Sequence, residues 1–145
     1  MRLYLDISAL VKLYVVEEGS PLVRKSVEEA ETVATSLVSY VEGRAAFARR
    51  RREGILTVTD QNRIVRDFND EWKRYFVIDV TNPLVNNAAK LAEHHGLRGY
   101  DAIQLASAEF FREKIRVAVT FGCWDDRLET AAGRQGLQLL RSRVQ

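Results

Sequence analysis

The sequence contains a single cysteine, Cys123, and only two prolines among its 145 residues. One cysteine excludes an internal disulfide, so we expect a packed core rather than cross-links to hold the fold. No apolar run reaches the roughly 20 residues needed to cross a bilayer. The segment after Met1 also lacks the basic start, apolar centre and small-residue cleavage site of a secretory signal. These absences predict a cytoplasmic protein with no membrane partner.

Repeats, low-complexity tracts and linkers rich in Pro, Gly or Ser are missing as well. Hydrophobic residues make up 46% and charged residues 29%, a balance typical of globular rather than disordered chains. We predict one domain over residues 1–145, long enough to bury a core. A strong excess of positive charge is also absent, because the net charge is only +2. Charge alone therefore does not indicate nucleic-acid binding.

Short apolar segments alternate with longer helical ones along the chain. The predicted strands cover residues 2–5, 32–35, 76–80, 117–120 and 137–140. The predicted helices cover residues 8–16, 21–30, 38–53, 59–75, 83–95, 101–114 and 125–135, with Ser20, Thr59 and Asn82 as N-caps. This alternation is typical of an α/β fold, specifically a three-layer α/β/α sandwich with a mostly parallel central sheet.

Acidic residues follow the predicted strands. Asp6 comes directly after the first strand, Glu42 lies on the helix after the second, and Asp125 follows the fourth. Because the carboxyl ends of parallel strands meet at one edge of a sheet, we expect these three side chains at the same edge. Asp101, in the first turn of its predicted helix, joins them only if that helix starts there.

Carboxylates gathered at one edge repel each other unless a cation neutralises them. Oxygen ligands without histidine or cysteine favour Mg²⁺ or Mn²⁺ over Zn²⁺. Each acid also has a simpler interpretation, since Asp6 or Ser8 could cap a helix and Asp101 or Asp125 could complement a helix dipole. Glu42 is harder to explain in this way, because its neighbours are apolar or small and a carboxylate is rarely buried unpaired.

Four segments around these acids resemble, in order, the motifs of the PIN-domain family, especially the VapC-type toxins. The segments are LDISALVKLY (5–14), SYVEGRAA (39–46), YDAIQLASA (100–108) and DDRL (125–128). The resemblance implies a metal-dependent endoribonuclease that hydrolyses RNA phosphodiester bonds, as the toxin of a VapBC-type toxin–antitoxin pair. It implies Mg²⁺ (or Mn²⁺) as cofactor, and as catalytic and metal-binding residues Asp6, Glu42, Asp101 and Asp125. Ser8 matches a small hydroxyl residue that contacts the site beside the first acid.

Two positions depart from the family pattern. A threonine commonly stands a residue or so before the fourth acid, whereas residues 121–124 separate Thr120 from Asp125. Either the loop is longer here, or Asp126 serves as the fourth acid. Gln104 stands where many members have a histidine, a difference that we expect to matter little to the metal.

The implied reaction is in-line attack by water, leaving a 5′-phosphate and a 3′-hydroxyl. Asp101 or Asp125 would orient or deprotonate that water. Arg49 is a candidate phosphate contact, since it shares the helical face of Glu42 about 10 Å further along. The implied partners are RNA, a cognate antitoxin and a second copy in a homodimer. An apolar surface for a partner could come from Leu10, Leu13 and Tyr14, unless they belong to the core.

The sequence fits three other functions less well. A phosphatase of the haloacid dehalogenase type needs a second aspartate two residues after the first, where Ser8 stands. A response-regulator receiver needs paired acids near the first strand and a lysine after a late strand, and neither is evident. A non-catalytic PIN fold, acting as an RNA-binding or scaffold module, would be expected to lose an acid, whereas all four positions are filled.

Overall fold

The computed structural model describes residues 1–144, and its five strands form one fully parallel sheet. The strands are β1 (Arg2–Leu5), β2 (Thr32–Ser36), β3 (Phe76–Ile78), β4 (Val119–Gly122) and β5 (Gln138–Leu139). Their order across the sheet is β3-β2-β1-β4-β5, so β1 is central and pairs with a strand on each side. The predicted α/β fold is confirmed.

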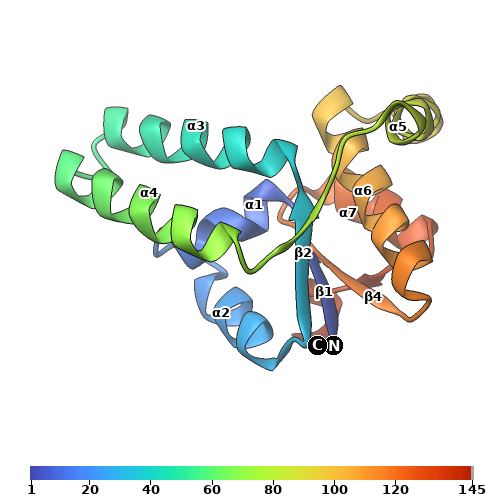
Figure 1. The fold of residues 1–145 in the computed structure, drawn as a ribbon, viewed down its shortest axis with the longest axis horizontal. Helices are drawn as coiled ribbons and strands as arrows, with labels where there is room; N and C mark the ends of the chain where they lie inside the picture. The colour runs from blue at the N-terminus through green and yellow to red at the C-terminus, as the bar shows by residue number, and fades with distance from the viewer. Residues whose placement is uncertain (145) are drawn as a thin grey trace.

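Helices cover both faces of the sheet and complete the three predicted layers (Figure 1). One face carries α1 (Ile7–Leu10), the 3-10 helix η1 (Val11–Leu13), α2 (Ser20–Glu29), α3 (Val38–Arg52) and α4 (Val58–Trp72). The other face carries α5 (Asn82–His95), α6 (Gly99–Ile115) and α7 (Asp126–Arg134), and the chain ends near the 3-10 helix η2 (Arg141–Val144). None of the helices in the described part of the chain is long and apolar enough to cross a membrane.

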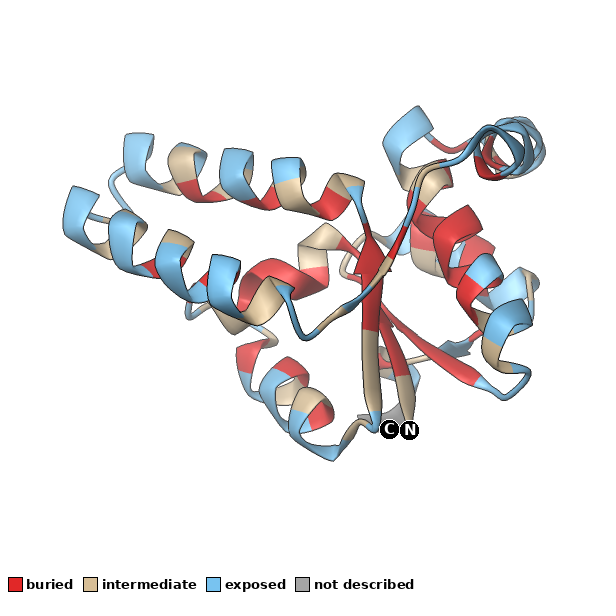
Figure 2. Cartoon of the chain, viewed as in Figure 1, coloured by how far each residue is buried: buried red, intermediate tan, exposed pale blue. Residues whose placement is uncertain are grey.

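Alternation along β1 divides the core between the two faces. Leu3 and Leu5 belong to the cluster under the first group of helices, and Tyr4 belongs to the cluster under α5, α6 and α7. Figure 2 shows the burial concentrated in the strands and in the sides of the helices that face them. Because β1 is the central strand, the residue that follows it, Asp6, lies in the middle of the carboxyl edge of the sheet.

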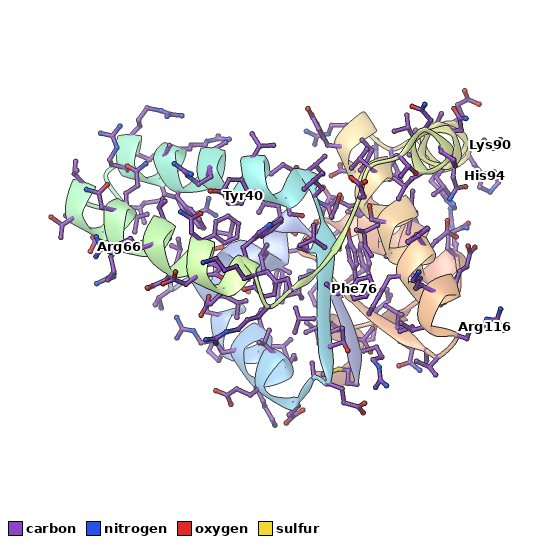
Figure 3. All side chains as sticks on the ribbon, viewed as in Figure 1. Tyr40, Arg66, Phe76, Lys90, His94 and Arg116 are labelled. Carbon is purple, nitrogen blue, oxygen red and sulfur yellow. The ribbon has the colours of Figure 1, made fainter. Side chains whose placement is uncertain are left out.

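The α3–α4 pair forms a long hairpin that extends away from the sheet (Figure 1). Tyr40 lies between the two helices near the sheet (Figure 3), where its ring stacks on Phe68 with centroids 5.4 Å apart. Gly43 permits this packing, because a Cβ there would lie 3.0 Å from the Cζ atom of Phe68. Tight contact between the helices therefore accounts for a glycine inside α3.

The first predicted helix, over residues 8–16, is wrong in length. The α-helical part ends at Leu10 and continues as the 3-10 helix η1 to Leu13. Leu10 is fully buried, and Leu13 and Tyr14 pack against the same core cluster. Leu10 is therefore core and offers no surface to a partner, whereas Leu13 and Tyr14 are only partly buried and Leu13 lines a surface hollow.

Several predicted boundaries also move. The N-caps of α2, α4 and α5 lie one or two residues before the predicted ones, at Gly19, Thr57 and Thr81 rather than Ser20, Thr59 and Asn82. At α4 the reason is a reciprocal capping box: the Thr57 hydroxyl accepts from the Asp60 N–H at 3.0 Å, and the Asp60 carboxylate accepts from the Thr57 N–H at 3.0 Å. The position of the α4 N-cap thus depends on two residues, Thr57 and Asp60, and not on one.

Strand β4 begins two residues later than predicted and ends at Gly122. Val117 is 47% exposed, whereas Gly122 is buried so tightly that a Cβ would lie 2.7 Å from the Cδ2 atom of Leu5. Glycine has low strand propensity, so the sequence pattern did not place it in a strand. The shift shortens the apparent loop before Asp125, because only two residues now separate that acid from the end of the strand.

Candidate active site

The four predicted acids lie at the carboxyl edge of the sheet, each on a different element. Asp6 follows β1 and caps α1, Glu42 lies in the second turn of α3, Asp101 lies in the first turn of α6, and Asp125 caps α7. The N-terminal end of α6 lies on the same side as the strand ends (Figure 1), so the condition set for Asp101 is met. The negative charge of Asp101 raises the pKa of both Asp6 and Glu42, and the negative charge of Asp125 raises the pKa of Asp101.

Asp6 is a buried carboxylate that forms no ion pair with the described side chains, those of residues 1–142. Its side chain accepts at Oδ1 from the Ser8 hydroxyl at 2.6 Å and from the Ala9 N–H at 3.0 Å. Burial, and to a smaller extent the charges of Asp101 and Glu42, raise the pKa of Asp6 from 3.8 to about 7, although the two hydrogen bonds lower it. The cost of charging this group is therefore large.

Glu42 is held by a side chain from α6. Its Oε1 atom accepts from the Nε2 atom of Gln104 at 2.8 Å. Burial raises the pKa of Glu42 above its ordinary value, the hydrogen bond from Gln104 lowers it, and the charge of Asp101 raises it again. Gln104 was expected to matter little, yet it contacts an acid of the site. Its spacing of three residues from Asp101, which places both on one helical face, was the available signal.

Asp101 and Asp125 share a hollow of about 280 Å³, which is also lined by Asp126, Arg98 and Arg127. Burial and the charge of Asp125 raise the pKa of Asp101 above its ordinary value, and Arg98 lowers it. Solvent thus reaches the acidic edge from the side of α6 and α7. A substrate would meet these two carboxylates in the open part of the site.

The surroundings of Asp125 and Asp126 differ. Asp125 is half-buried, accepts from the Leu128 N–H at 2.9 Å and interacts with Asp101. Asp126 has a side chain that is 94% exposed and forms an ion pair with Arg141 at 2.9 Å. Asp125 is therefore better placed than Asp126 to be the fourth acid.

Ser8 and Arg49, the two predicted substrate contacts, lie in different settings. The Ser8 hydroxyl donates to Asp6 and accepts from the Trp124 N–H at 2.8 Å, so it ties the turn after β1 to the loop after β4. Arg49 lies on the exposed part of α3 and pairs with Glu53 at 3.4 Å. Within the described chain, Ser8 joins the acidic site and Arg49 contacts none of the four acids.

The donor set suits a hard divalent cation, since it consists of four carboxylates and a hydroxyl with no histidine. Within residues 1–144, no group of three or more His, Cys, Asp or Glu side chains is arranged to hold a metal ion. By the chemistry of their oxygen atoms the residues nevertheless fit Mg²⁺ or Mn²⁺, and their side chains would have to move closer together to bind it.

Comparison with known proteins gives the family. The family model described as PIN domain matches residues 3–123. Ribonuclease VapC45 and Ribonuclease VapC49 of Mycobacterium tuberculosis are each 34% identical to the chain over 136 residues, which is 94% of this chain and 92% of each relative.

Solved structures share the fold at low sequence identity. The crystal structure of PAE2754 from Pyrobaculum aerophilum superposes with a TM-score of 0.66 at 17% identity, covering 99% of this chain and 87% of that one. A toxin–antitoxin complex from Klebsiella pneumoniae gives a TM-score of 0.58 at 16% identity, covering 83% and 84%. These likenesses support the fold, and the family model and the 34% identical relatives establish the kinship. The chain belongs to the PIN domain family, among its VapC-type members.

Proposed function

We propose that residues 1–145 form one nuclease domain that hydrolyses RNA phosphodiester bonds with Mg²⁺ or Mn²⁺, as the toxin of a VapBC-type pair. The buried carboxylate of Asp6 carries this proposal. It shares the sheet edge with Glu42 and Asp101, and none of the described side chains, those of residues 1–142, forms an ion pair with it. The relatives with 34% identity are named ribonucleases, which supports RNA as the substrate.

The residues that would hold the ion are Asp6, Glu42, Asp101 and Asp125. A bound divalent cation supplies positive charge at a scissile phosphate oxygen and stabilises the negative charge of the transition state. Ser8 keeps Asp6 oriented through its 2.6 Å hydrogen bond and is the proposed substrate contact beside that acid. Arg49, exposed on the same helix as Glu42, is the proposed contact to phosphates further along the RNA.

Asp101 is the proposed acceptor of a proton from the attacking water. It is partly exposed and lines the solvent-accessible hollow together with Asp125. In the ion-free protein its pKa is raised above the ordinary value by burial and by the charge of Asp125. Cleavage would leave a 5′-phosphate and a 3′-hydroxyl.

We also propose a cognate antitoxin as partner, a homodimer as the assembly and the cytoplasm as the location. The structural neighbour described as a toxin–antitoxin complex supports the antitoxin. The homodimer and the location rest on the resemblance to VapC-type proteins. Light scattering on the purified chain would distinguish a dimer from a monomer.

The test is cleavage of RNA by purified protein in Mg²⁺ or Mn²⁺, compared with EDTA and with the variants Asp6→Asn and Asp101→Asn. Asp70→Asn is the matched control, because Asp70 is exposed on α4 and forms no ion pair in the described part of the chain. We expect chelation to abolish cleavage, re-addition of the metal to restore it, and each site variant to lose on the order of a hundredfold or more in rate. The control should cleave like the wild type.

Cleavage that persists in EDTA and in both site variants would contradict the metal-nuclease proposal. Binding of RNA without cleavage, at any concentration of either metal, would favour the non-catalytic RNA-binding or scaffold module instead.

A further inference from the structure

Gln104 links the acidic site to the interior of the protein. This side chain on α6 is only 1% exposed. Its Nε2 atom donates to the Oε1 atom of Glu42 at 2.8 Å and to the Ser39 hydroxyl at 2.9 Å, and its Oε1 atom accepts from the Tyr4 hydroxyl at 2.6 Å. One amide thus joins residues of β1, α3 and α6.

The chemistry of these partners decides which way the amide faces. A carboxylate that binds a cation is ionised and only accepts hydrogen bonds, so in that form of Glu42 the nitrogen of Gln104 must face it. The amide oxygen then faces Tyr4, whose hydroxyl donates to it. Tyr4 is fully buried and its ring stacks on Phe121 with centroids 5.5 Å apart, so this donor is fixed in place. A reversed amide would set its oxygen against the carboxylate.

The network continues from Ser39 to the backbone beside Asp6. The Ser39 hydroxyl lies 2.7 Å from the Thr35 hydroxyl, which in turn lies 2.7 Å from the carbonyl oxygen of Leu5. Among the described residues, no buried side-chain nitrogen or oxygen is left without a hydrogen-bond partner. A polar network that is fully satisfied in a buried region is rigid. Glu42 is therefore attached to the same rigid framework that carries Asp6.

We propose that Gln104, held in orientation by Tyr4, is a positioning residue that presents Glu42 to the divalent ion. This inference rests on the proposed metal-dependent nuclease function. In this role Gln104 acts through Glu42 and does not contact the ion. Hydrogen-bond partners of metal ligands commonly contribute about 10- to 100-fold to metal affinity or activity. Gln104, which stands where many family members have a histidine, would then matter to the metal site, contrary to the expectation from the sequence.

The experiment is a calorimetric titration of the ion-free protein with Mn²⁺, using the wild type and three variants. Gln104→Met keeps the length of the side chain and removes the amide, and Tyr4→Phe removes only the hydroxyl that orients it. Gln135→Met is the matched control, because its Nε2 atom also donates to a carboxylate, that of Glu109 at 2.7 Å, outside the acidic site. RNA cleavage and thermal unfolding are measured on the same preparations.

We expect the Kd for Mn²⁺ to rise about 10- to 100-fold in Gln104→Met and less in Tyr4→Phe, with no change in Gln135→Met. A merely structural role would lower the unfolding temperature and leave the Kd of the folded protein unchanged. A folded Gln104→Met that binds Mn²⁺ within about twofold of the wild type would overturn the inference, since it falls outside the range for such partners. If Gln104→Met does not fold, the Kd of Tyr4→Phe for Mn²⁺ decides instead, and a value within about twofold of the wild type would overturn the inference.

The wild type separates the two proposals. Wild-type protein that binds Mn²⁺ and cleaves RNA only without EDTA, together with variants of unchanged Kd, would overturn the positioning role alone. Wild-type protein that binds no Mn²⁺ and cleaves RNA in EDTA would overturn the metal-nuclease proposal, and the positioning role with it.

Discussion

Two buried charges in the segment after β1 have opposite environments. Lys12 is 7% exposed, and its ammonium group lies 3.1 Å from the carboxylate of Glu17 and 4.9 Å from the ring centroid of Trp124. Asp6 is 2% exposed, and the described side chains give it no counter-charge, only hydrogen bonds from a hydroxyl and a backbone N–H. Buried charges are ordinarily paired, so Lys12 is the usual case and Asp6 the exception.

A shortage of cations does not explain the difference. The chain contains 22 lysines and arginines, and Glu17 alone is shared between Lys12 and Arg50, the latter at 3.2 Å. The charges that act on Asp6 are instead those of Glu42 and Asp101, which raise its pKa further. Near Lys12 the protein balances charge internally, whereas at the sheet edge it leaves negative charge in excess. Such an excess is what a site for an external cation requires.

The largest expected effect comes from neutralising Asp6. Asp6→Asn retains an oxygen that can accept from Ser8 and Ala9 and removes the buried charge. Raising the pKa of Asp6 from 3.8 to about 7 costs about 1.4 kcal/mol per pKa unit. We therefore expect the ion-free variant to be more stable than the ion-free wild type at pH 8, by up to ~4 kcal/mol in urea unfolding.

The difference in stability between ion-free Asp6→Asn and the ion-free wild type should grow as the pH rises. Because folding raises the pKa of Asp6, its protonation stabilises the folded state; this contribution is complete below about pH 4 and is lost as the pH rises through about 7. The ion-free wild type should lose stability across that interval, and the advantage of Asp6→Asn should vanish near pH 4. If Asp6→Asn were less stable than the wild type at pH 8, the buried charge of Asp6 would not be destabilising, and Asp6 would not differ from Lys12 in this respect.

Neutralising Glu17, the partner of Lys12, is expected to lower the stability of the fold, opposite to the effect expected for Asp6→Asn. Glu17→Gln leaves a buried ammonium group without its counter-charge, which should destabilise the fold by about 2 kcal/mol, less than for a fully buried pair because the Glu17 side chain is 26% exposed. Glu18→Gln, at the exposed neighbouring position, is the control and should change stability by less than about 0.5 kcal/mol. Equal urea midpoints for Glu17→Gln and Glu18→Gln would show that Glu17 does not stabilise the buried ammonium group of Lys12.

Replacing Asp125 and Asp126 separately by asparagine tests which of the two belongs to the acidic edge. Asp125→Asn preserves the N-cap of α7, since asparagine caps as well as aspartate, and should lower the rate of RNA cleavage about tenfold or more, or about 1.4 kcal/mol in the transition state. Asp126→Asn, which loses only an exposed pair with Arg141, should cleave at the wild-type rate. The reverse result would assign the fourth acid to Asp126.

The smallest effect is expected at Arg49. Arg49→Gln should weaken RNA binding slightly and make the slope of log affinity against log salt shallower by about 0.7, as for the loss of one phosphate contact with a single strand. Lys25→Gln is the control, because Lys25 also forms an exposed i,i+4 pair, with Glu29 at 4.0 Å. Equal slopes for the two variants, measured by fluorescence anisotropy, would exclude Arg49 as a specific contact.

Much of the fold was predictable because chain order and hydrophobic pattern determine it. Asp6 and Glu42 were placed correctly, since the rule that parallel strands share a carboxyl edge needs only the order of strands and helices. The end of β4 was missed because Gly122 has no side chain to reveal it. Its place in the sheet depends on Leu5 of the neighbouring strand, which packs where a Cβ would be.

The contacts that organise the site could not be predicted, because they join residues far apart in the sequence. Tyr4 and Gln104 are separated by 100 positions, and Ser8 and Trp124 by 116. Whether a buried amide orients an acid or only fills space depends on which groups lie within hydrogen-bond distance. The pattern around residue 104 shows that it lies on an inward face, and says nothing of the groups that it meets there.

The claim that the sheet edge is built for a divalent cation is tested most directly by thermal unfolding of the ion-free wild type and Asp6→Asn at pH 8, with increasing Mg²⁺ at constant ionic strength. An ion that binds only the folded state stabilises it by about 1.4 kcal/mol at ten times its Kd. We expect Mg²⁺ to raise the unfolding temperature of the wild type and to leave that of Asp6→Asn unchanged. Equal shifts in the two proteins, or no shift in either, would contradict it.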